Sequence, residues 1–141
     1  MNLTRRHALA MGGAAIAVTL IPTSYALAST DLVDAAIKAF AGDAVVGDGG
    51  IDLTTPEIAE NGNTVPIAVF AKGAKRIMVL AGGNPSPEVV TFNFSELAEP
   101  MGSTRIRLAG TQDVIAVAEM ADGTYTKVAK SVKVTIGGCG G

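Results

Sequence analysis

The second half of the chain alternates between apolar and polar positions, the pattern of β-strands that bury one face. In the segment 89–94, for example, Val90, Phe92 and Phe94 fall on one face and polar side chains on the other. This pattern predicts strands at 65–71, 76–81, 89–94, 104–108, 114–120 and 125–136. Because turns rather than helices separate these segments, we predict an all-β fold, an immunoglobulin-like antiparallel β-sandwich.

A helical pattern precedes the strands, in residues 30–42. Thr30 or Asp31 can cap its first turn, and Gly42 can end it. Its apolar residues have the spacing of one helix face: Leu32, Val33, Ala36, Ile37 and Phe40. We therefore predict one short N-terminal helix before the strands.

The segments between the predicted strands carry turn signals. Asp122 and Gly123 are a strong signal for a β-hairpin between the last two strands. The glycine-containing segments 61–63, 72–75 and 83–87 are most simply read as turns. The domain is therefore predicted to have short connections throughout.

The N-terminus has the pattern of an export signal. The pair Arg5 and Arg6 precedes an uncharged stretch, residues 8–21, that is rich in alanine, glycine and valine. A membrane-spanning helix is the alternative, but about 14 apolar residues are too short to cross roughly 30 Å of hydrocarbon. The paired arginines favour the twin-arginine route, which exports folded proteins. The sequence thus predicts a periplasmic protein.

Small residues follow the apolar stretch at the two positions that a signal peptidase reads, Ala26 and Ala28. We therefore predict that residues 1–28 are the export signal and are removed. The remaining 113 residues make one ordinary domain, with the sandwich in 29–136. No other segment is long and apolar enough to predict a membrane span in the mature chain.

The residue inventory after the signal excludes most catalytic schemes. It contains no histidine, no tryptophan and a single cysteine. Ser-His-Asp and Cys-His arrangements need an imidazole, and zinc sites need several Cys or His ligands. We therefore predict no catalytic residue, no metal site and no cofactor, so that the domain enters a reaction as a substrate or carrier and not as an enzyme. Nine basic against thirteen acidic side chains, without a basic run, give no support for nucleic-acid binding.

The single cysteine, Cys139, stands near the C-terminus between two pairs of glycines: Gly137, Gly138, Gly140 and Gly141. Glycine adopts both signs of φ and has no Cβ, so these residues predict a flexible arm without blocking side chains. Fully extended, the arm (residues 137–141) reaches roughly 17 Å beyond the last strand. The arm holds no charge and no base, so we expect an ordinary thiol that a partner must activate.

Other roles for these residues were weighed. A buried structural cysteine does not fit polar and glycine surroundings, and a prenylation site needs one more residue after Cys139. An intermolecular disulfide remains open in an oxidising compartment. Arg105 and Arg107 share one face of a predicted strand and can hold an anion, although a solvated face is the simpler interpretation.

The sequence resembles the SoxY family of sulfur carrier proteins, which belongs to the periplasmic thiosulfate-oxidising system. The resemblance covers nearly the whole chain and rests on the twin-arginine signal and three motifs. These motifs are PEIAENG at 56–62, NPSP at 84–87 and GGCGG at 137–141. The terminal pentapeptide is the most specific of them.

The resemblance implies a covalent role for Cys139 and names its partners. It implies a heterodimer with a SoxZ-like subunit of similar fold. A haem-containing enzyme would couple thiosulfate to Cys139, and a hydrolase would then release sulfate and leave a persulfide. In some organisms a sulfur dehydrogenase oxidises the outer sulfur before a second hydrolysis. The four glycines would form the swinging arm, and the stretch 56–62 would shape the partner interface.

Two other functions remain as alternatives. The first is an exported structural sandwich whose Cys139 forms an intermolecular disulfide, which needs no glycines. The second is a ubiquitin-like sulfur carrier charged as a thiocarboxylate at Gly141, because the chain ends in Gly140 and Gly141. The export signal and the predicted hairpin argue against the second alternative.

Overall fold

The computed structural model describes residues 24–137, and residues 1–23 and 138–141 lie outside the described part. The chain begins there with the helix α2 (Ser24–Ala41) and continues as nine β-strands. Their bounds are β1 (Val46–Asp48), β2 (Asp52–Thr54), β3 (Ile58–Ala59), β4 (Val65–Phe70), β5 (Ala74–Ala81), β6 (Glu88–Asn93), β7 (Met101–Ile106), β8 (Gln112–Met120) and β9 (Tyr125–Val134).

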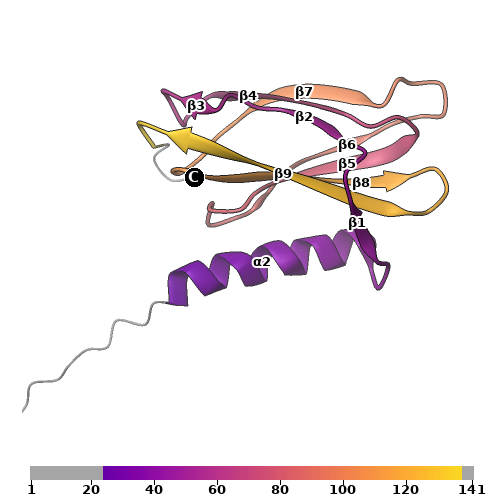
Figure 1. The fold of residues 1–141 in the computed structure, drawn as a ribbon, viewed down its shortest axis with the longest axis horizontal. Coiled ribbons are helices and arrows are strands. Elements are labelled where there is room, and N and C mark those ends of the chain that lie inside the picture. Colours follow the sequence, from indigo (N-terminus) through magenta and orange to yellow (C-terminus); the bar gives the residue numbers. More distant parts are fainter. Residues whose placement is uncertain (1–23, 138–141) are drawn as a thin grey trace, which may run out of the picture.

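The strands form two sheets that pack face to face as an immunoglobulin-like sandwich. The larger sheet has the order β1-β9-β8-β5-β6, with β3 also paired to β9, and the smaller sheet has the order β2-β4-β7. In Figure 1 the smaller sheet lies above the larger one, and α2 lies below both. The predicted all-β sandwich with one N-terminal helix is therefore confirmed.

The six predicted strands are all present, as β4 to β9, and they pair antiparallel. The sequence did not predict β1, β2 and β3, which are two or three residues long and too short to show an alternating pattern. Two of them, β1 and β3, pair with β9 in parallel, so the sandwich is not purely antiparallel. Strands β1 and β3 form along one edge of β9, whereas β2 pairs with β4 in the smaller sheet.

The helix α2 begins six residues earlier than predicted. Thr30 therefore lies inside the helix and is not its cap. The residues before Thr30 include alanine and leucine, which are good helix formers, so no local signal stops the helix there. The predicted end is confirmed: Gly42 has φ +64° and its N–H donates to the carbonyl of Lys38 at 2.7 Å.

The main core lies between the two sheets. It is built mostly from valine, isoleucine, leucine and alanine that alternate inward along the strands. In β4, for instance, Val65, Ile67 and Val69 are buried, and the residues between them are more exposed. In the described part of the chain, every buried polar side-chain atom has a hydrogen-bond partner. The alternating side chains of the strands therefore fill the space between the two sheets.

A second, smaller core joins α2 to the outer face of the larger sheet. Val33 of the helix packs with Met78, Leu80 and Val117, all of which are buried. This cover explains why β5 reads as an unbroken apolar run over 77–81 instead of alternating, since both of its faces are buried. The helix therefore completes a third layer.

Segment 72–75 is a turn, as predicted, but it does not make a hairpin. It joins β4 of the smaller sheet to β5 of the larger one, so the chain changes sheets there. Gly73 supports this turn with φ +81°, and the N–H of Ala74 donates to the carbonyl of Ala71 at 3.0 Å. Sequence alone does not distinguish a turn within a sheet from one between sheets.

The hairpin between β8 and β9 is confirmed. The N–H of Met120 donates to the carbonyl of Thr124 at 2.8 Å, and Gly123 has φ +84°. Asp122 accepts from the Thr124 hydroxyl at 2.6 Å and from its N–H at 2.9 Å. These two hydrogen bonds lower the pKa of Asp122, so they favour its ionised form in the folded state.

A Gly123→Ala substitution tests this turn. The positive φ of Gly123 disfavours a Cβ, so we expect the free energy of unfolding to fall by about 1–2 kcal/mol. Gly110→Ala is the matched control, because Gly110 lacks a positive φ and has open space around its Cα. Urea denaturation measures both, and an equal loss in the two variants would contradict the role given to Gly123.

Candidate functional site

The structure describes only part of the predicted site. Cys139, Gly138, Gly140 and Gly141 lie outside the described residues, as do Arg5 and Arg6. Ala26 and Ala28 fall within α2. Gly137 is described, and it follows the last strand at the end of the sandwich where β3 also lies (Figure 1). The described site is therefore the place from which the cysteine segment continues.

Residues 135–137, which we call the arm base, are held on one side by the chain around β3. The N–H of Thr135 donates to the carbonyl of Ala59 at 3.0 Å, and its hydroxyl donates to the carbonyl of Glu60 at 3.0 Å. The carbonyl of Ile136 accepts from the N–H of Gly62 at 2.8 Å. Hydrogen bonding therefore continues beyond Val134, where β9 ends.

The loop 107–111 lies against the other side of the arm base. The N–H of Val134 donates to the Thr111 hydroxyl at 3.0 Å. A Cβ built on Gly137 would lie 2.5 Å from the carbonyl oxygen of Ala109, which is closer than real contacts allow. Gly137 is thus in close backbone contact with this loop.

A buried pair of amide side chains holds the loop 107–111 in place. Asn84 is 5% exposed, and its Nδ2 donates to the carbonyl of Arg107 at 2.8 Å. Its Oδ1 accepts from the N–H of Ala109 at 2.9 Å and from Nε2 of Gln112 at 2.9 Å. Nε2 of Gln112 also donates to the carbonyl of Gly110 at 3.1 Å. Asn84 therefore fixes the backbone of the loop 107–111 in addition to lying in its own turn.

The motifs at 56–62 and 84–87 thus lie at the same end of the sandwich as Gly137. Gly62 joins the first of them to the loop 107–111, because its carbonyl accepts from the N–H of Leu108 at 2.7 Å. Asn84 of the second motif binds the same loop. The sequence had shown these motifs only as turns or as features of a resemblance. The sequence did not indicate a role for Thr111 or Gln112. Gln112 could have been noticed, because a glutamine at the start of an apolar strand needs a hydrogen-bond partner when it is buried.

The two arginines weighed as an anion site are both exposed. Arg107 lies beyond the end of β7, and Arg105 is on β7. Within residues 24–137 neither forms an ion pair. Both line a polar hollow together with Glu88, a carboxylate that would repel an anion. The described geometry gives the anion interpretation no further support.

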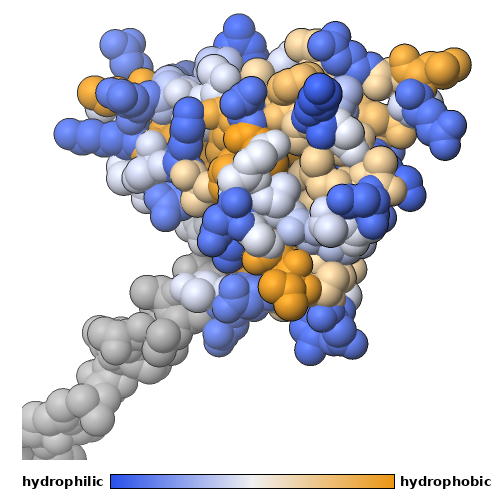
Figure 2. Space-filling view, turned by 45° about the vertical axis from the view of Figure 1, so that its right-hand side comes forward, coloured by the Kyte–Doolittle hydropathy of each residue, from blue (hydrophilic) through white to orange (hydrophobic). Residues whose placement is uncertain are grey.

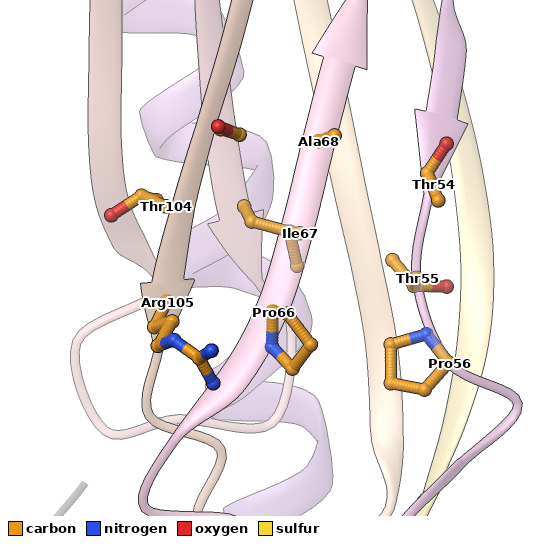
Figure 3. Close-up of a pocket in the computed structure, with 9 residues that line it drawn as sticks. Thr54, Thr55, Pro56, Pro66, Ile67, Ala68, Thr104 and Arg105 are labelled. Carbon is orange, nitrogen blue, oxygen red and sulfur yellow. The ribbon is translucent and has the colours of Figure 1, made fainter.

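A shallow hollow of about 570 Å³ lies on the outer face of the smaller sheet. Figure 3 shows Thr54 and Pro56 on one side of it, Ala68 and Pro66 on β4, and Arg105 extending toward Pro66. Figure 2 shows hydrophobic residues interspersed with hydrophilic ones over the face turned to the viewer. The hollow offers apolar contact, several hydroxyl groups and one guanidinium.

Within the described residues, no cluster of three or more His, Cys, Asp or Glu side chains is placed to hold a metal ion. Among residues 24–137, no helix is long and apolar enough to cross a membrane.

Fold and site together define a class of protein: an immunoglobulin-like β-sandwich whose last strand is held at one end and continues into a glycine-flanked cysteine. Residues 37–139 match the family described as "Sulfur oxidation protein SoxY", and this match extends to Cys139. Because the match covers more than half of the sequence, the chain belongs to the SoxY family. A search of curated proteins found no match.

Solved structures agree with this family. The chain is similar to the sulfur carrier protein SoxY from Chlorobium limicola f thiosulfatophilum, with 34% identity and a TM-score of 0.68 over 76% of this chain and 99% of that chain. A superoxide reductase (neelaredoxin) from Ignicoccus hospitalis is 15% identical, with a TM-score of 0.54 over 60% of this chain and 78% of that chain. That second likeness shows the fold alone. Family and structure together support a sulfur carrier role in sulfur oxidation.

Proposed function

We propose that the chain carries the intermediates of thiosulfate oxidation as covalent adducts on Cys139. The observation that carries this proposal is the family match, which spans residues 37–139 and therefore includes Cys139. The arm base adds physical support. Backbone segments contact it on both sides, so the proposed arm would begin from a fixed position. The glycines of the terminal segment, Gly137, Gly138, Gly140 and Gly141, leave the thiol free of blocking side chains, so that the segment can take it into the narrow active sites of partner enzymes.

The proposed chemistry begins with an oxidative coupling. The thiol sulfur of Cys139 bonds to the outer sulfur of thiosulfate, one proton leaves, and a haem-containing enzyme accepts two electrons. A hydrolase then adds water to the terminal sulfonate group, which leaves as sulfate while a persulfide stays on Cys139. In this scheme the carrier supplies only the thiol and its access, which agrees with a chain that is not an enzyme.

We further propose that a SoxZ-like subunit pairs with the sandwich and that the pair acts in the periplasm. The signal in residues 1–28, with Arg5 and Arg6, directs export by the twin-arginine route. Cleavage after Ala28 would remove the first turn of α2. It would leave Val33 and the rest of the helix face that packs on the sheet. Sulfur dehydrogenase is a further partner where that branch of the pathway is present.

Intact mass spectrometry tests the proposal. The mature protein is purified from periplasm after exposure of the cells to thiosulfate and is measured with and without a thiol reductant. We expect cleavage after Ala28 and a reductant-labile adduct of sulfur or thiosulfonate mass on Cys139. A plain disulfide dimer, or an unmodified thiol in cells that oxidise thiosulfate, would contradict the carrier function and favour a structural sandwich.

A further inference from the structure

We propose that Gly137 is a fixed packing point and that rotation of the cysteine arm begins only after it. This inference deepens the proposed carrier function and rests on it. It assigns Gly137 and Asn84 as positioning residues, which set where and in which direction the thiol leaves the sandwich. The first glycine of the GGCGG motif is then required for close contact, and the glycines that follow it supply the freedom of the arm.

The first step of the argument is the contact of Gly137 itself. A Cβ at this position would stand 2.5 Å from the carbonyl oxygen of Ala109 and 3.4 Å from its carbonyl carbon. Both atoms belong to the backbone, so no side-chain rotation relieves the clash. A glycine is therefore required by the approach of two backbone segments, a use of glycine distinct from flexibility.

The second step is that neighbouring backbone groups are also fixed. Gly62 is buried and bonds on both sides: its N–H donates to the carbonyl of Ile136, and its carbonyl accepts from Leu108. Ile136 is thus tied to the same loop that Gly137 touches. Two adjacent residues of the arm base are held against one loop, which leaves little freedom for a hinge between them.

The third step is that the loop itself does not move freely. Oδ1 of Asn84 accepts from the N–H of Ala109, and Nδ2 of Asn84 donates to the carbonyl of Arg107. Asn84 and Gln112 are 5% and 9% exposed, so their hydrogen bonds have little competition from water. Gly83 closes the network by donating its N–H to Oε1 of Gln112 at 2.8 Å. The backbone on both sides of the Ala109 carbonyl, at the N–H of Ala109 and the carbonyl of Gly110, is therefore held by buried partners.

These three steps give the arm a defined origin. A thiol that hinges at Gly138 sweeps a smaller volume than one that hinges at Val134, so it is presented to a partner at a more nearly constant position. Misplacement of a reacting group by about 1 Å can lower a rate by about a hundredfold. A fixed origin therefore matters for loading by an enzyme and matters little for a small reagent that reaches the thiol from any side.

Gly137→Ala tests the inference, and Gly138→Ala is its matched control. Backbone amide NMR on the purified mature protein supplies a readout that does not depend on any enzyme. In Gly137→Ala we expect the Ala109 amide resonance to shift and fast motion to extend back from residue 138 toward Val134. We expect Gly138→Ala to leave both unchanged. Asn84→Ala, with exposed Asn63→Ala as control, should shift the same Ala109 resonance.

A second measurement compares two reactions of Cys139. Loading by the thiosulfate-coupling enzyme should fall about tenfold in Gly137→Ala. The rate with a small disulfide reagent should stay within about twofold, because access to the thiol is not lost. A Gly137→Ala variant with an unmoved Ala109 resonance would overturn the inference, and so would a Gly137→Ala variant that is loaded at the wild-type rate. If wild-type protein is not loaded at all while the resonance still shifts, the carrier proposal fails and the packing of Gly137 stands.

Discussion

A Cys139→Ser variant is expected to acquire no thiosulfate-derived adduct and to support no thiosulfate oxidation when it replaces the wild-type chain in the complete enzyme system. The expected loss is total, because a serine hydroxyl cannot form the sulfur–sulfur bond that retains thiosulfate. No other thiol replaces it, since Cys139 is the only cysteine in the sequence. Intact mass and the rate of thiosulfate consumption measure the two losses.

A relocated thiol provides the control for this variant. Cys139→Ser combined with Ser131→Cys puts the thiol on the exposed face of β9 without flanking glycines. We expect this protein to react with a small disulfide reagent and to remain unloaded by the coupling enzyme. Loading of the relocated thiol at the wild-type rate would show that any exposed thiol serves. An adduct on the single variant would contradict Cys139 as the attachment point.

The second large effect concerns the layer between α2 and the larger sheet. Leu80 is fully buried there, next to Met78 and Val117. Leu80→Ala removes most of a side chain from this core and leaves a cavity, so we expect the free energy of unfolding to fall by about 2–5 kcal/mol. Such a loss is a large part of the roughly 5–15 kcal/mol that stabilises a typical domain. Urea denaturation followed by circular dichroism measures it.

Leu32→Ala is the matched control. Leu32 lies on α2, the helix that covers Leu80, but its own side chain is 46% exposed. We expect this substitution to cost less than about 1 kcal/mol. If α2 did not cover the sheet, Leu80 would lie on an open face and both substitutions would cost similarly little. The difference between the two variants therefore tests the third layer of the fold directly.

The candidate site shows where sequence reasoning reached its limit. The glycines around Cys139 and the turn residues at 61–63 and 83–87 were visible as local signals. Their meeting at one end of the sandwich was not, because Asn84 and Ala109 bind each other across 25 residues of chain. Gly137 looked like a source of flexibility, and only the position of Ala109 showed that close contact also requires a glycine there.

The sequence by itself determined the class of fold, the six long strands and the hairpin at Asp122 and Gly123. It could do so because alternating burial and turn chemistry are local properties that each segment carries alone. It also singled out Cys139, the only cysteine in the sequence, as the predicted attachment point for a covalent intermediate.

Only the tertiary structure decided the three short strands and the sheet change at 72–75. It also decided the arrangement of the arm base. Each of these depends on which distant segment supplies a hydrogen-bond partner or an apolar face. These pairings form only in the folded chain. The sequence does not predict them, because backbone groups and short glycine-rich segments have no hydrophobic pattern that indicates which distant segment they contact.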